Sequence, residues 1–260
     1  MFDRCRSMIL DAVLNPAEIA LLPKRDLSNA TCVVFDVLRA TSSMITGLAH
    51  GVAEIRPVRT IEEALALKTE LPHAILGGER HGERIDGFDV GNSPFEYRDL
   101  AGRTVISTTT NGTVALRACE HADRVLVGAA LNLNALAEVI SEAQPERLVV
   151  VCAGTFEEFA LEDAYAAGKL IEAFERDAEL TDSARAALAV AKTYADPLDA
   201  LRQARNGRAL SAKGRELEVD WCAQLSRFTV VGQMQEGIIR ARPSKGGVKD
   251  AVPAESAGAV

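Results

Sequence analysis

Along residues 32–151, short apolar runs alternate with helical patterns, and this alternation constrains the fold more than any other feature of the sequence. The apolar runs are rich in Val, Ile and Leu, as in strands that are covered on both faces. They occupy residues 32–35, 55–58, 74–76, 104–106, 125–127 and 148–151. The helical patterns occupy residues 43–50, 61–71, 113–121 and 133–143. This order predicts an α/β fold with a mainly parallel or mixed central sheet and helices on both faces.

The C-terminal third of the chain departs from this alternation. Residues 156–225 are almost wholly helical in pattern, and residues 228–231 and 238–239 are candidates for late edge strands. Residues 244–260 are rich in Gly, Ala, Ser and Pro and are predicted to form a flexible C-terminal tail. With 260 residues, 48% of them hydrophobic, the chain can build a single α/β domain over residues 1–243.

Composition disfavours several classes of function. The net charge is −8 and no basic block is longer than two residues, which argues against nucleic-acid binding. No apolar run reaches the roughly 18 residues of a membrane span. Residues 8–10 are too short for the core of a signal peptide, so we expect a cytoplasmic protein. Five scattered cysteines and four histidines lack the spacing of a disulfide framework or a metal site. A homo-oligomer is compatible with the sequence.

The first segment suited to chemistry joins an apolar strand to a helix. The strand ends at Asp36, and Arg39 and Thr41 precede the helix, at the sheet end where ligands gather. Asp36 could bind a metal ion or attack phosphorus, and Arg39 could grip a phosphate. The alternative is that Thr41 or Ser42 only caps the helix while Asp36 pairs with Arg39. Leu38 stands where haloacid-dehalogenase-type phosphatases place a second aspartate, which argues against that class.

A second strand-to-helix turn contains Thr109, Thr110, Asn111, Gly112 and Thr113. Successive N–H groups in such a turn form a concave nest for an anion, and the threonine hydroxyls add donors. Gly112 permits a positive φ or the close approach of a ligand to the backbone. An ordinary turn with a threonine cap is the alternative.

A third segment, residues 77–98, is rich in glycine and charge and begins with Glu79 after a strand candidate. Glu79 is therefore expected at the same sheet end as Asp36. A carboxylate in that position suits Mg²⁺, which prefers oxygen ligands and keeps several waters.

The fourth segment places acids on a helix. Asp163 falls on an apolar stripe that begins at Phe159, whereas Glu158 and Glu162 fall off it and are expected to be solvated. An inward carboxylate is costly unless it is paired or bound to a metal. Asp163 is therefore expected to bind a metal ion or to pair with a buried arginine.

Together and in this order, the segments resemble the 2-phosphosulfolactate phosphatases. The resemblance spans roughly residues 8–230, and its most specific strings are Gly-Phe-Asp-Val-Gly-Asn-Ser-Pro at 87–94 and Thr-Thr-Asn-Gly-Thr at 109–113. The other matching segments are 36–41, 78–80, 153–154 with 162–163, and the Gly-Arg element at 206–210. Ala204 departs from the family, in which a serine is expected shortly before that element, and this leaves the role of the C-terminal helices open.

The resemblance implies a three-layer α/β/α fold and an Mg²⁺-dependent phosphatase. The reaction would hydrolyse 2-phospho-3-sulfolactate to sulfolactate and phosphate, a step toward coenzyme M. The substrate would therefore be a small, strongly anionic phosphate ester. On this interpretation Asp36, Glu79 and Asp163 hold the Mg²⁺ ion, and Asp36 is also the candidate nucleophile.

The remaining site residues follow from the same interpretation. Arg39, Thr41 and the loop of residues 109–113 would contact the phosphoryl group, while Arg80 and Asn92 would orient the substrate. Two alternatives stay open: a phosphatase of a different small ester, and a non-catalytic module that binds or senses an anion. A Rossmann dehydrogenase is disfavoured because no GxGxxG string follows an early strand.

Overall fold

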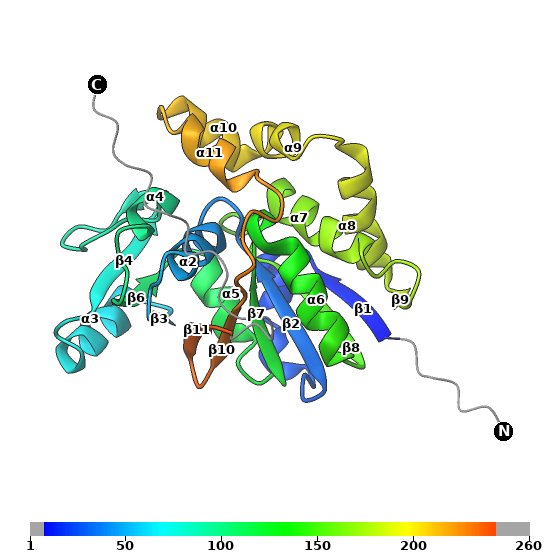
Figure 1. Cartoon of the computed structure of the whole chain (residues 1–260), viewed down its shortest axis with the longest axis horizontal. Coiled ribbons are helices and arrows are strands. Elements are labelled where there is room, and N and C mark those ends of the chain that lie inside the picture. The colour runs from blue at the N-terminus through cyan, green and yellow to red at the C-terminus, as the bar shows by residue number, and fades with distance from the viewer. Residues whose placement is uncertain (1–7, 243–260) are drawn as a thin grey trace.

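The computed structural model describes residues 8–242 and contains an eleven-stranded sheet with helices on both faces (Figure 1). The strand order is β5-β4-β6-β3-β11-β10-β7-β2-β8-β1-β9. The strands are β1 (Met8–Val13), β2 (Ala30–Phe35), β3 (Glu54–Pro57), β4 (Ile75–Arg80), β5 (Glu83–Arg84), β6 (Thr104–Thr108), β7 (Arg124–Gly128), β8 (Arg147–Cys152), β9 (Ala178–Leu180), β10 (Gly232–Gln235) and β11 (Ile238–Ala241).

Helices cover the sheet on its two sides and complete a three-layer α/β/α fold, as predicted. They are α1 (Pro16–Ile19), α2 (Ala40–Ala49), α3 (Ile61–Glu70), α4 (Pro94–Tyr97), α5 (Gly112–Ala118), α6 (Leu133–Ala143), α7 (Leu161–Glu172), α8 (Asp182–Thr193), α9 (Pro197–Gln203), α10 (Arg205–Ala212) and α11 (Glu216–Cys222). Alternate residues of β2 enter different cores. Val33 and Phe35 belong to the core under α6 and α7, whereas Cys32 and Val34 belong to the core under α2 and α5.

The sheet is mixed: an antiparallel hairpin lies in its middle, and β5 pairs antiparallel with β4 at one edge. Strands β9, β1, β8, β2 and β7 run parallel, as do β3, β6 and β4. The hairpin β10–β11 joins the two groups, because β10 pairs with β7 and β11 pairs with β3. The prediction of late edge strands is therefore wrong: residues 228–231 precede β10, and the hairpin is central. The place of the hairpin in the sheet is decided by its pairing with β7 and β3, which are distant in sequence. The local sequence pattern does not show which strands will pair.

Most other elements confirm the sequence pattern. Each predicted apolar run lies in or overlaps a strand, and the helix predicted at 133–143 has the bounds of α6. Strand β4 runs on to Arg80, so Glu79 lies within a strand rather than after one. Strands β1, β5 and β9 were not predicted. The tail predicted at 244–260 lies outside the described residues. Within residues 8–242, no helix has the length and apolar character needed to cross a membrane.

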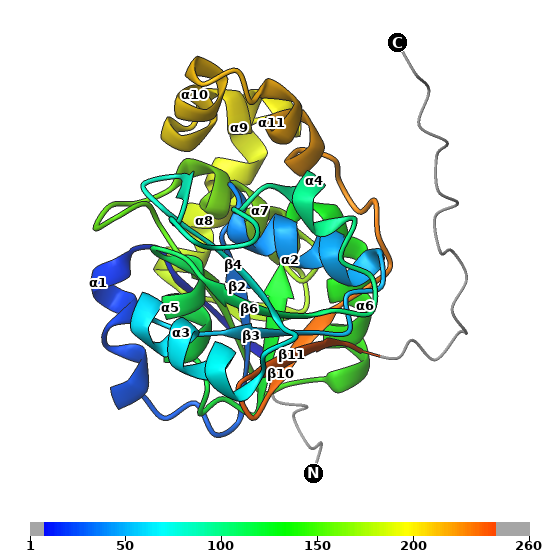
Figure 2. The same cartoon turned by 90° about the vertical axis from the view of Figure 1, so that its left-hand side faces the viewer.

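The last three helices form a cap, which we define as residues 197–222 (α9, α10 and α11). Figure 2 shows it above α7 and α4. Trp221 of α11 fastens the cap, since its indole N–H donates to Thr46 Oγ1 at 3.0 Å. The guanidinium carbons of Arg98 and Arg227 lie 4.1 and 4.5 Å from the Trp221 ring centroid, and each forms a cation–π contact with it.

Candidate active site

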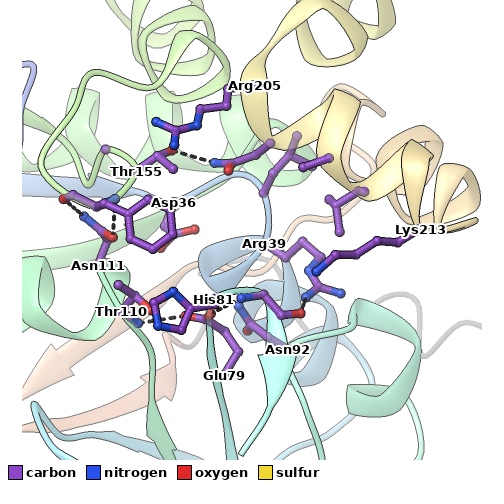
Figure 3. Close-up of a pocket in the computed structure, with 17 residues that line it drawn as sticks. Asp36, Arg39, Glu79, His81, Asn92, Thr110, Asn111, Thr155, Arg205 and Lys213 are labelled. Atoms are coloured by element: carbon purple, nitrogen blue, oxygen red, sulfur yellow. Dashed lines mark hydrogen bonds between the residues drawn. The ribbon is translucent and has the colours of Figure 1, made fainter.

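A cavity of about 270 Å³ lies between the cap and the loops that follow β2, β4, β6 and β8. The sheet twists strongly, so that β3 and β6 cross the direction of β2 in Figure 2. Residues from distant strands can therefore face one cavity. Figure 3 shows Asp36, Glu79, Thr110 and Asn111 on the side of the sheet, which we call the floor. Residues of the cap form the opposite wall.

Asp36 follows β2 and lies half-buried in the floor. The N–H group of Ala40, at the start of α2, donates to its Oδ1 at 3.1 Å. Thr41 is fully buried, and its hydroxyl bonds the backbone N–H and C=O of Asp36 at 3.0 and 2.9 Å. Thr41 therefore positions Asp36 and does not line the cavity, where the sequence predicted a contact with substrate.

Gly112 allows the loop after β6 to approach Asp36 closely. A Cβ atom at Gly112 would lie 2.6 Å from Asp36 Oδ2, closer than real Cβ contacts allow. The close approach predicted at Gly112 is thus to a carboxylate of the protein itself. Burial raises the pKa of Asp36 to about 7, and the charges of Glu79 and Glu162 act in the same direction. The N–H groups of Ala40 and Gly112 oppose that shift.

Glu79 is buried in the floor and is held by two backbone N–H groups. Thr110 donates to its Oε1 and Gly82 donates to its Oε2, each at 2.7 Å. Because side chains alternate along a strand, Arg80 points away from the cavity. Its guanidinium donates to Glu79 O at 2.7 Å and to Thr108 Oγ1 at 3.0 Å. Arg80 therefore does not lie where a residue that orients the substrate was predicted.

The loop of residues 109–113 is an anion nest, as its sequence suggests, but the anions nearest to it are side chains of the floor. Thr110 donates to Glu79, and Gly112 lies against Asp36. Thr109 and Thr113 are buried and bond each other through backbone N–H and hydroxyl groups at 3.0 and 3.1 Å. They hold the turn and do not line the cavity.

Asn111 and Thr110 are the members of that loop that do line the cavity. The Asn111 amide donates to Ala153 O at 3.0 Å and to Phe156 O at 2.9 Å, and so joins the loop after β6 to the loop after β8. The Thr110 hydroxyl oxygen is buried and has no hydrogen-bond partner within residues 8–242. A bound ligand could supply one.

Asp163 is buried in the first turn of α7, as predicted, but it has neither of the expected partners. Its Oδ1 accepts the Val37 N–H at 2.8 Å, and its Oδ2 accepts the Gly154 N–H at 3.0 Å. It therefore ties the loops after β2 and β8 together behind Asp36. In the described part of the chain, no three His, Cys, Asp or Glu side chains are arranged to hold a metal ion. The predicted trio of Asp36, Glu79 and Asp163 is not assembled, because Asp163 faces backbone donors.

A two-carboxylate site is still compatible with the residues of the floor. Asp36 and Glu79 both line the cavity and offer only oxygen atoms. Magnesium in enzymes is commonly held by one or two carboxylates, with waters and substrate phosphate as the remaining ligands. The donor set of the floor therefore fits Mg²⁺ and does not fit a soft metal.

Arg39 lines the cavity and connects the floor to the cap. Its buried guanidinium forms an ion pair with Glu218 of α11 and donates to Gly82 O at 2.9 Å. The alternative pair of Asp36 with Arg39 is not formed, because Arg39 turns to Glu218. Asn92 also lines the cavity, as predicted.

Glu162 was expected to be solvated, and this is wrong: it is only 1% exposed. The apolar stripe was traced from Phe159, which lies before α7 begins and is 44% exposed. In addition, α10 covers the first turn of α7, and Asn206 Nδ2 donates to Glu162 Oε1 at 2.6 Å. The periodicity of one helix does not show that a side chain on it will be buried by another helix.

Several cavity residues were missed altogether. Arg205 and Lys213 reach the cavity from the cap (Figure 3) and pair with Glu158 and Glu83, respectively. His81 contacts Phe156, with 5.5 Å between ring centroids. Nothing in the sequence marked these positions. Asn206 is different, since it begins the family-like string at 206–210.

The fold and site define a class: a three-layer α/β/α protein whose cavity has carboxylates at strand ends beneath a wall that contains Arg205 and Lys213. The model of the 2-phosphosulpholactate phosphatase family matches residues 18–237. The chain belongs to this family.

Curated relatives agree with this assignment. A probable 2-phosphosulfolactate phosphatase of Deinococcus radiodurans is 40% identical over 224 residues, which is 84% of this chain and 93% of the relative. Proteins with the same description from Caldanaerobacter subterraneus and Carboxydothermus hydrogenoformans are 37% and 36% identical. These matches cover 83% and 88% of this chain, and 92% and 95% of the relatives. The similarity therefore includes both the floor and the cap.

Proposed function

We propose that this protein is a phosphoric monoester hydrolase that converts 2-phospho-3-sulfolactate to sulfolactate and inorganic phosphate. Family membership supports the reaction. The observation that carries the proposal is the cavity of about 270 Å³, which places Asp36 and Glu79 opposite Arg205 and Lys213. Carboxylates on one side and cations on the other suit a small ester whose phosphoryl group must react while its other anionic groups are held.

The charge of the substrate explains the composition of the wall. 2-Phospho-3-sulfolactate has a phosphate, a carboxylate and a sulfonate on three carbons, so it needs several cationic or N–H donors. Arg205 and Lys213 are about half exposed and form ion pairs with the exposed acids Glu158 and Glu83. Exposed pairs of this kind contribute little to stability, so their cations are available to a stronger anion.

Asp36 is the candidate nucleophile. Attack of its carboxylate oxygen on phosphorus breaks the P–O bond to the oxygen on carbon 2, which leaves as the sulfolactate hydroxyl after taking up a proton. A water molecule then hydrolyses the aspartyl phosphate, releases phosphate and restores the carboxylate. If Asp36 instead serves only as a metal ligand, water attacks phosphorus directly. Acid quenching of a single turnover with ³²P-labelled substrate separates the two, since labelled phosphate becomes covalently bound to Asp36 only if Asp36 is the nucleophile.

Mg²⁺ is the proposed cofactor. Asp36 and Glu79 are the cavity-lining carboxylates suited to hold it, and a bound Mg²⁺ ion would neutralise charge on the phosphoryl oxygens. Arg39 adds positive charge between the floor and the cap, although its ion pair with Glu218 reduces its strength as a phosphate ligand. A cytoplasmic location and a place on the route to coenzyme M remain predictions; the described cysteines are free and buried, which favours a reducing compartment.

The experiment is a phosphate-release assay on a panel of esters. The panel contains 2-phospho-3-sulfolactate, 2-phospholactate, 3-phosphoglycerate and nucleotides, each with Mg²⁺ and with excess chelator. We expect turnover to be fastest with 2-phospho-3-sulfolactate, to stop with chelator and to return with Mg²⁺. Turnover of another ester above all others would change the substrate, and anion binding without turnover would favour the non-catalytic module. Full activity in chelator would refute the Mg²⁺ proposal.

A further inference from the structure

A tight turn after β8 brings an aromatic ring to the cavity. Thr155 and Glu158 exchange two backbone hydrogen bonds, at 2.9 and 3.0 Å, so Phe156 and Glu157 are the central residues of a two-residue turn. Phe156 has a φ of 54°, in the left-handed region that favours glycine, at a turn position where glycine is common. Phe156 nonetheless lines the cavity and is 40% exposed. A strained and exposed apolar residue beside a charged site indicates a functional role, because neither strain nor exposure stabilises the fold.

Asn111, in the floor, fixes this turn. Its Nδ2 donates to Phe156 O at 2.9 Å, and its Oδ1 accepts the Phe156 N–H at 3.0 Å. A single side chain therefore bonds both backbone polar groups of Phe156 and offsets part of the cost of the positive φ. Asn111 belongs to the loop after β6, which also approaches Asp36 through Gly112. The floor thus sets where the Phe156 ring lies.

The Phe156 ring contacts two other side chains that line the cavity. The centroid of the His81 ring lies 5.5 Å from that of Phe156. The guanidinium carbon of Arg205 also lies 5.5 Å from the Phe156 centroid, within the range of a cation–π contact. In addition, Arg205 forms an ion pair with Glu158 of the same turn. Figure 3 shows Arg205 on the side of the cap and Asn111 on the floor. The guanidinium of a cap residue is therefore held by a turn that the floor fixes.

We propose that Phe156 is a specificity-determining residue, which positions Arg205 to bind an anionic group of the substrate other than the phosphoryl group. A guanidinium over an aromatic ring keeps its N–H donors, which lie in its own plane, directed at a carboxylate or sulfonate. Contact with the ring also restricts the arginine before the substrate binds, so less side-chain entropy is lost on binding. The inference deepens the proposed function and rests on it only for the identity of the anion.

The first test measures the contact without substrate. Wild type, F156G and F159G are treated with phenylglyoxal, an arginine-specific reagent, and the modification rates of Arg205 and Arg202 are followed by mass spectrometry. Arg202 is the internal control, because it lies in the same cap, pairs with an acid and has a side-chain exposure of 53%, against 52% for Arg205. Phe159 is the control ring, since it lies in the same loop, is 44% exposed and does not line the cavity.

We expect F156G to speed modification of Arg205 at least about threefold, in keeping with the loss of an exposed cation–π contact, and to leave Arg202 unchanged. F159G should change neither rate. F156W should react like wild type, because tryptophan restores an aromatic face beside the guanidinium.

The second test is a double-mutant cycle on KM and kcat with the ester that is turned over fastest. F156G should raise KM about fivefold, the value of one exposed cation–π contact, and change kcat less than about twofold. In the R205A background the same substitution should raise KM less than about twofold, since the ring has lost its partner. Equal effects of F156G with and without Arg205, or a wild-type KM in F156G, would overturn the inference.

Folding of the variants is checked by Tm. Glycine relieves the positive φ, so F156G should melt no lower than wild type. If it unfolds, F156L takes its place, because leucine keeps the apolar bulk without the aromatic face, and the same changes in modification rate and KM are expected. A folded variant without the ring that keeps the wild-type modification rate of Arg205 also contradicts the inference. Absence of turnover with every ester counts against the proposed function alone, because the modification rate is measured without substrate.

Discussion

The floor and the cap of the cavity hold their charged groups by different means. On the floor, backbone N–H groups from Thr110, Gly82 and Ala40 bond Glu79 and Asp36, whose positions follow from the fold itself. In the cap, Arg205 and Lys213 are exposed and pair with the exposed acids Glu158, in the loop after β8, and Glu83, in β5. Preorganised groups suit the reacting centre, whereas adjustable groups suit recognition. We therefore propose that the floor performs the chemistry and that the cap selects the substrate.

The largest effect is expected at the centre of the floor. D36N should lower kcat on the order of a thousandfold or more, with a smaller change in KM, because Asp36 acts in the transition state. Asn keeps the shape, so Tm should change little. Steady-state kinetics and thermal melting check this, with D123N, in an exposed turn before β7, as the control. A folded D36N with more than about a tenth of wild-type turnover would remove Asp36 from the mechanism.

A second variant disturbs the floor without removing a charge. In G112A the new Cβ would lie 2.6 Å from Asp36 Oδ2, so the carboxylate must move. Displacement of a reacting group by about 1 Å can cost a hundredfold in rate, and overpacking costs about 1–3 kcal/mol of stability. G102A is the control, because it introduces a strained backbone at a positive φ with no neighbour within 4 Å. If G112A lost stability but kept its kcat, the rigid placement of Asp36 would not matter.

Variants of the cap should separate recognition from chemistry. R205A and K213A should each raise KM about tenfold, the value of one charge-assisted hydrogen bond, with kcat changed less than about threefold. R202A is the matched control, since Arg202 lies in the same cap but pairs with Asp220 away from the cavity. A fall in kcat with unchanged KM in R205A would place the cap in the chemical step and break the comparison.

The smallest effect concerns pH and the metal-free protein. Burial raises the pKa of Asp36 to about 7, so the folded state binds this proton more tightly than the unfolded chain does. The resulting stability is complete below about pH 4, the unfolded pKa, and is lost as pH rises through about 7. In chelator, the free energy of unfolding should therefore fall between pH 5 and pH 7 more steeply in wild type than in D36N, by about 1 kcal/mol per pH unit. Parallel profiles would contradict this.

The sequence predicts the residues of the floor better than those of the cap. Asp36 and Glu79 were found because they stand at strand ends, a position that short apolar runs locate well. Asp163 was placed inside correctly, yet its partners are backbone groups of two other loops. The burial of Glu162 depends on Asn206, which is 44 positions later in the chain and on another helix.

The central hairpin was missed for a comparable reason. Residues 232–241 are short strands whose place in the sheet is set by β7 and β3, and these are distant in sequence. In the sequence, Arg205 and Lys213 look like ordinary surface charges, because they face the cavity only once the cap has folded over it. Local pattern therefore predicts the floor, and long-range packing decides the cap.

The most direct test of the account compares two substrates that differ only in the sulfonate. The measurement is the ratio of kcat/KM for 2-phospho-3-sulfolactate to that for 2-phospholactate, in wild type and in the R205A/K213A double variant. The account predicts a wild-type ratio of about a hundred, the value of two charge-assisted contacts. In the double variant the ratio should fall toward one, while kcat is largely kept. A wild-type ratio near one, or a double variant that keeps the ratio and loses kcat, would contradict the claim that the floor reacts and the cap selects.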